Sequence, residues 1–148
     1  MAKAAREELR ERIDAIEGAY EYFLAYAAQG IREESEGARV IGQFRRHVDG
    51  MAEGISGIGG CLRRLLAEEE IHAADRFEAF AEVVTADAAR AGSAIELVRA
   101  QRFATSQLVD NLNASTHLRA LLTDLFLVDE LLGLGVDLSP AARAPEPA

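Results

Sequence analysis

Internal disulfide bonds are excluded in this chain, because Cys61 is its only cysteine. Tryptophan is absent, lysine occurs once, and six Phe and three Tyr are the aromatic residues among 148 positions. The core must therefore be built from aliphatic side chains and alanine, which suit closely packed helices. No apolar run approaches the ~20 residues that span a bilayer, and the N-terminal residues lack the apolar stretch of a secretory signal. These absences predict a cytoplasmic protein with no membrane partner.

Positive charge is also scarce, since 16 Lys and Arg face 25 Asp and Glu and leave a net charge of -9. Such a chain repels phosphate backbones, which argues against nucleic acid as a partner. The preference for Arg over Lys, together with abundant Ala, indicates a GC-rich bacterial genome. A hydrophobic content of 49% with 28% charged residues is ordinary for a globular protein. We expect one helical-bundle domain over residues 1–138 and a disordered tail over residues 139–148.

The strongest helical pattern lies between Leu9 and Ile31. Apolar residues recur there in steps of three and four, as on one face of an amphipathic helix. Either Gly30 or Gly37 can supply the left-handed residue that ends such a helix. A second helix is predicted from about Val40.

A glycine-dense segment, residues 50–61, follows the second helix and admits two interpretations. Each glycine inside a helix costs roughly 1 kcal/mol, which favours a loop or hinge. However, Gly50, Gly54, Gly57 and Cys61 are spaced four, three and four apart, so a continuous helix would present a narrow groove of small residues. Another backbone could approach closely there.

The second half of the chain predicts three further helical segments. The first covers about residues 62–89, and the boundary after it is marked by Gly92 and a capping box from Ser93 to Glu96. The next runs to about Asn111, and the polar residues 111–116 leave open whether one kinked helix continues there or two separate helices meet. The last covers residues 118–132 and stops at Gly133. The fold class is therefore all-α, an antiparallel, up-and-down bundle of four or five helices.

One acidic residue stands out because helical spacing places it on an apolar stripe. Within the predicted helix 62–89, Glu69 lies between Leu66 and Ala73, and His72 follows it by one turn. A buried carboxylate needs a partner, since leaving it unpaired costs several kcal/mol. Arg76 or Arg45 could pair with Glu69 and make it a structural residue.

The alternative partner is a metal ion, with Glu69 and His72 as its ligands. Their Glu-x-x-His spacing is similar to the motif of ferritin-like proteins, whose paired motifs hold two iron or manganese ions between helices. Only one such motif occurs here, so a complete site would require a homodimer. Glu17, Glu21 or Asp129 could complete it.

Three other features admit a functional and a structural interpretation. Cys61 could be a reactive thiol next to Arg63 and Arg64, or a small packed side chain. Tyr20 on the first helix could lie near a metal, or could belong to the core. The polar cluster at residues 111–116 could bind a small ligand, or could cap a kink.

The predicted function rests on the last helix. Leu125, Phe126, Leu127 and Val128 run around it, which is more apolar surface than one stripe. One side therefore needs a partner or full burial. We favour a non-enzymatic, homo-oligomeric accessory protein without a cofactor. It would bind a protein partner or a second copy of itself. The alternatives are the dimeric metal protein and a small-ligand sensor that uses the bundle interior.

Overall fold

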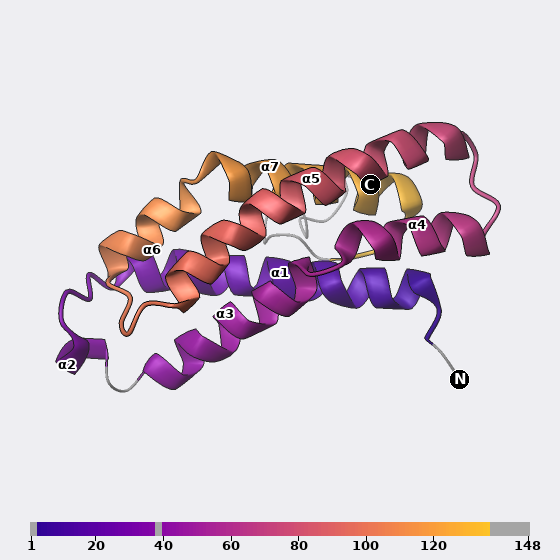
Figure 1. Cartoon of the computed structure of the whole chain (residues 1–148). Helices are drawn as coiled ribbons and strands as arrows, with labels where there is room; N and C mark the ends of the chain where they lie inside the picture. Colours follow the sequence, from indigo (N-terminus) through magenta and orange to yellow (C-terminus); the bar gives the residue numbers. More distant parts are fainter. Residues whose placement is uncertain (1–2, 38–39, 137–148) are drawn as a thin grey trace, which may run out of the picture.

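The computed structural model describes residues 3–37 and 40–136, and this part of the chain is helical without strands (Figure 1). The helices are α1 (Ala5–Ala28), α2 (Glu34–Gly37), α3 (Ile41–Ile55), α4 (Ile58–Glu68), α5 (Ala74–Arg99), α6 (Ser106–Asn113) and α7 (Thr116–Leu132). The predicted all-α class is confirmed. The number of helices in these residues exceeds the predicted four or five, because two long segments are bent and α2 adds a single turn. The predicted tail at residues 139–148 lies outside the described residues.

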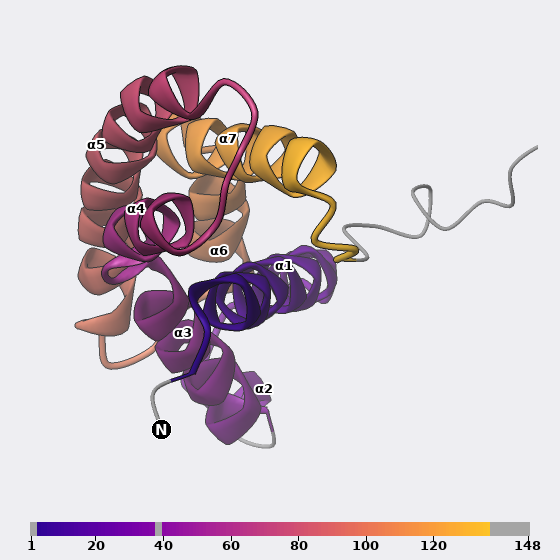
Figure 2. The ribbon, with the colours of Figure 1, turned by 90° about the vertical axis from the view of Figure 1, so that its right-hand side faces the viewer.

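The helices form four antiparallel rods. The first is α1, the second is α3 followed by α4, the third is α5, and the fourth is α6 followed by α7 (Figures 1 and 2). α1 packs on α3, α4 and α6, while α5 packs on α3, α4 and α7. α7 packs mainly on α5 and makes a smaller contact with α1. No helix in the described ranges is both long enough and apolar enough to cross a bilayer.

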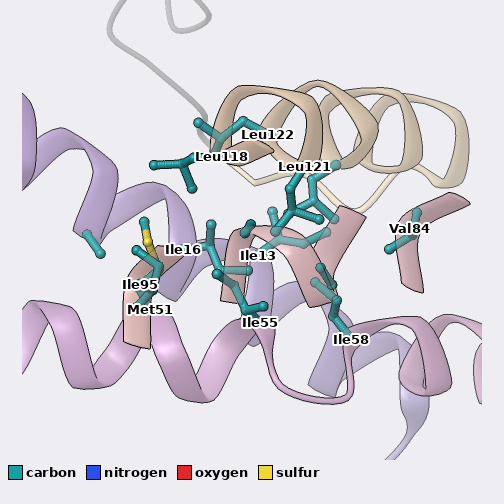
Figure 3. Close-up of a cluster of buried hydrophobic side chains, with 14 of the residues drawn as sticks. Ile13, Ile16, Met51, Ile55, Ile58, Val84, Ile95, Leu118, Leu121 and Leu122 are labelled. Carbon is teal, nitrogen blue, oxygen red and sulfur yellow. The ribbon is translucent and has the colours of Figure 1, made fainter. Parts of the chain in front are cut away.

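The core lies between the rods and is aliphatic, as the composition predicts. Figure 3 shows side chains from α1, α3, α4, α5 and α7 that point toward one another. The buried residues labelled there are Ile13, Ile16, Met51, Ile55, Ile58, Val84, Ile95, Leu118, Leu121 and Leu122. Burying such side chains is the main stabilising contribution, at ~1.5–3 kcal/mol for each large aliphatic group.

α1 follows the predicted periodicity closely. Its buried face carries Leu9, Ile13, Ile16 and Phe23, spaced as one helical stripe. The helix ends before Gly30, which has a φ of 67°. Gly30 is therefore the left-handed residue that the sequence left undecided.

The glycine-dense segment is mostly helical, so the loop prediction is wrong over most of its length. α3 continues to Ile55, and the rod bends only at Ser56 and Gly57, where Gly57 takes a φ of 79°. Its glycines also allow close approach. A Cβ at Gly59 would lie 1.9 Å from the Thr85 Oγ1 of α5, and one at Gly54 would lie 3.0 Å from the Arg12 carbonyl of α1. The segment thus combines a sharp bend with close helix contacts.

The predicted continuous helix over residues 62–89 is wrong. α4 ends at Glu68, and the chain reverses through residues 69–73, where Ala73 adopts a φ of 60°. Neither Gly nor Pro marks this turn. The reversal lets α4 pack against α5, which one straight helix could not do with itself. Tertiary packing overrides helix propensity here.

The predicted boundary at Gly92 and Ser93 is also wrong, because α5 runs without interruption to Arg99. The Ser93 hydroxyl donates to the Ala89 carbonyl one turn earlier, and does not cap a new helix. Ala91 and Ile95 are buried on either side and hold this part of α5 in the core. The sequence left open whether the helix is kinked or broken near residues 111–116, and the structure contains a break, since α6 ends at Asn113 and α7 begins at Thr116.

Candidate functional site: an apolar groove at one end of the bundle

Glu69 and His72 do not share a helical face. Glu69 is the residue at which α4 ends, with extended backbone angles. His72 lies in the following turn and is exposed. The spacing argument fails because it assumed a continuous helix, whereas the chain reverses between these two residues.

Glu69 pairs with Arg6, and with neither of the arginines proposed from the sequence. The Arg6 guanidinium donates to both carboxylate oxygens, through Nε at 3.0 Å and through Nη2 at 2.9 Å. Its Nη1 donates to the Leu132 carbonyl at the end of α7, at 2.6 Å. The hydrogen bonds from Arg6 lower the pKa of Glu69 below its usual range. Arg6 thus joins α1, the end of α4 and the end of α7.

The proposed metal ligands have different surroundings from those that the ferritin-like motif requires. No group of three or more His, Cys, Asp and Glu side chains that could hold a metal ion occurs within the described ranges. Glu69 forms an ion pair with an arginine, which is the contact expected of a structural carboxylate. Iron or manganese binding by Glu69 and His72 across a dimer remains a prediction, to be tested by metal loading.

An open groove of about 610 Å³ lies beside this ion pair, between α5, α7 and the turn that precedes α5. Its walls are apolar, with Val128 and Leu132 buried and the other side chains partly or largely exposed. The remaining apolar residues of the lining are Ile71, Ala73, Phe77, Phe80, Leu127 and Leu131. Polar groups stand only at the edge, from Arg6, Glu70, His72 and Arg76. This composition suits an apolar occupant with a few polar contacts at its margin.

The outer face of α7 continues the apolar surface of the groove. Leu131 is 67% exposed, Leu127 is 49% exposed and Phe126 is 38% exposed, whereas Leu125 and Val128 are buried. The sequence argument that α7 carries more apolar surface than one stripe is therefore correct. The described residues leave its outer side open to solvent.

Buried acids form a second feature of α7. Asp124 and Asp129 are buried on this helix, and Glu17 is buried on α1. Burial raises the pKa of Glu17 to about 8, with further contributions from Glu21 and Asp129. Burial and the neighbouring Asp87 raise the pKa of Asp124 to about 7. Asp124 lies on the apolar stripe between Leu121 and Val128, so the argument applied to Glu69 could have found it.

The remaining candidates are structural. Cys61 is buried, its thiol faces the Ala5 carbonyl, and burial raises its pKa to about 12. This favours the packed side chain over the reactive thiol. Tyr20 is half-buried against the core. In the polar cluster, Asn113 is buried and its side-chain amide has no hydrogen-bond partner, while Ser115 and Thr116 lie at the break.

No known family accounts for this arrangement. No protein-family model matches the chain, and no similar curated protein or solved structure was found. The fold and the groove therefore define the protein only as an all-α bundle whose described surface carries an apolar groove between α5 and α7.

Proposed function

We propose that this protein is a non-enzymatic accessory module that self-associates through the α5–α7 groove. The observation that carries the proposal is the uncovered apolar face of α7, formed by Phe126, Leu127 and Leu131. Covering one exposed leucine contributes roughly 1.5–3 kcal/mol, so a partner surface here is strongly favoured. The arginine-rich and cysteine-poor composition supports a bacterial cytoplasmic setting for this module.

A second copy fits because the surface carries both a projection and a hollow. Leu131 is the most exposed of the three residues, and it stands at the edge of the groove that it helps to line. Two-fold symmetry places the same patch on both subunits, so each Leu131 can enter the partner's groove. The interface is then self-complementary in shape.

Charge is complementary in the same arrangement. Arg76 at the groove edge is 87% exposed, and its contact with the adjacent Asp75 is long, at 3.9 Å. Glu130 is exposed on α7 between Leu127 and Leu131. Inserting Leu131 into the partner's groove brings Glu130 toward the partner's Arg76. Each dimer would contain this pair twice, which favours a second copy over an unrelated apolar ligand.

Sedimentation equilibrium of the full chain tests this proposal. The unmodified protein is expected to dimerise at micromolar concentrations, and L127Q/L131Q should raise the dissociation constant at least about 100-fold. The matched control is L24Q/L97Q, because these leucines are 48% and 67% exposed but do not line the α5–α7 groove. The control should dimerise normally, and neither double variant should change the helical fold.

A charge exchange tests the orientation. E130R and R76E should each weaken the dimer, and the two changes together should restore it. A monomer at all micromolar concentrations, or equal effects of the groove and control variants, would reject self-association through this groove.

A further inference from the structure

Two acidic side chains of α7, Asp124 and Asp129, lie near acidic side chains of the neighbouring helices. Asp124 is near Asp87 of α5, and the negative charge of Asp129 helps to raise the pKa of Glu17 of α1. The exposed fraction is 2% for Glu17, 8% for Asp124 and 7% for Asp129. The docking surfaces of α7 therefore contain carboxyl groups that water barely reaches.

Among the residues that the structure describes, no Lys or Arg forms a salt bridge with Glu17, Asp124 or Asp129. Glu17 Oε1 and Asp124 Oδ2 are buried and have no hydrogen-bond partner. The charged groups that influence the pKa of Glu17 are Glu21 on its own helix and Asp129 on α7, and both are acidic. The group facing Asp124 from α5 is Asp87, which accepts a hydrogen bond from the largely exposed Arg90 at 3.4 Å. Asp129 accepts from the Val136 amide.

Asp124 is buried beside the partly exposed Asp87, and Glu17 and Asp129 are both buried. Two neighbouring carboxylates in such positions cannot both be ionised cheaply, because desolvation and mutual repulsion disfavour the second charge. Protonating one carboxylate of a pair removes both its desolvation cost and its repulsion with the other carboxylate. Since the folded chain holds these protons more tightly than the unfolded chain does, α7 docking is strongest below the ordinary carboxyl range. It weakens as the pH rises from that range through about 7 for Asp124 and about 8 for Glu17.

The same helices form the groove. Asp124 precedes Val128 of the lining by one turn of α7, and Asp87 follows Phe80 of the lining by two turns of α5. Any change in the spacing of α5 and α7 at the acid pair therefore changes the width of the groove nearby.

We propose that α7 is a proton-controlled wall of the groove, seated against α1 and α5 when Glu17 and Asp124 are protonated and loosened when they ionise. This inference rests on the proposed function only in its consequence for the dimer. Self-association is then tighter in mildly acidic than in alkaline solution.

The test combines hydrogen exchange with sedimentation equilibrium at pH 6 and pH 9. The variant E17Q/D124N keeps the buried groups neutral, and the control D14N/D110N removes the same charge from exposed positions. In the unmodified protein, amide protection of α7, corrected for intrinsic rates, should fall at least about tenfold more than that of α3 between the two pH values. The dissociation constant should rise in parallel.

Both pH effects should disappear in E17Q/D124N and persist in D14N/D110N. If α7 protection follows pH in this way but the protein is monomeric throughout, the proton-controlled wall stands and the proposed self-association fails. If α7 and α3 respond equally, or if E17Q/D124N keeps the pH effect, the proton-controlled wall is wrong whatever the oligomeric state.

Discussion

The two ends of the bundle are held together in different ways. At one end, which we call the closed end, Ser106 at the start of α6 accepts from the Ile31 amide and donates to the Tyr26 carbonyl, both at 2.8 Å. The Tyr26 hydroxyl donates to the Ala104 carbonyl at 2.8 Å. All of these groups are buried. The polar groups that hold the closed end together therefore satisfy one another inside the protein.

At the other end, which we call the open end, the helices are joined by a half-exposed ion pair between Arg6 and Glu69. Arg6 and Glu69 are 37% and 35% exposed, and the groove with Leu127 and Leu131 lies beside them. Buried hydrogen bonds that complete an end make it structural, whereas an end that keeps apolar surface uncovered is suited to binding. The comparison supports the proposal that the open end binds a partner.

The largest expected difference between the ends is in stability. S106A should lower the free energy of unfolding by about 2–4 kcal/mol, because it leaves the buried Ile31 amide and the Tyr26 carbonyl without their hydroxyl partner. Urea denaturation measures this change. As a control, S93A removes an exposed hydroxyl inside α5 and should change stability by less than about 0.5 kcal/mol. Similar effects of the two variants would remove the distinction between the ends.

A smaller effect is expected at the open end. R6M keeps the apolar stem but removes the bonds to Glu69 and to the Leu132 carbonyl, and it should cost about 1 kcal/mol because water partly screens the pair. R64M removes the hydrogen bonds of the more exposed Arg64 to the Glu8 carboxylate and the Lys3 carbonyl, and it should cost less. Both are measured by the same urea titrations. A loss of the size expected for S106A would show that the open end is fastened as rigidly as the closed end.

The sequence predicts elements whose signal is local. The stripe of α1, the stop at Gly133 and the excess apolar surface of α7 all follow from periodicity or turn chemistry, and the structure contains them. The all-α class follows from the same patterns.

The sequence does not predict features that depend on contacts across the chain. The reversal at residues 69–73 carries no glycine or proline, and α5 continues through Gly92 because buried neighbours hold it. The partner of Glu69 lies 63 positions away on α1, where spacing arguments do not reach. For the same reason, the sequence identifies α7 as apolar but does not place Phe77 and Phe80 opposite it.

Cross-linking at Leu131 tests the central claim, that the open end binds a second copy, most directly. L131C places a thiol at the proposed two-fold interface, and L97C places one at an equally exposed position outside it, each leucine being 67% exposed. The native Cys61 is buried with a pKa raised to about 12, so the unmodified chain serves as an inert reference. Under mild oxidation at low micromolar concentration, L131C should form disulfide-linked dimers rapidly while L97C remains monomeric. Equal rates for the two variants would contradict the account.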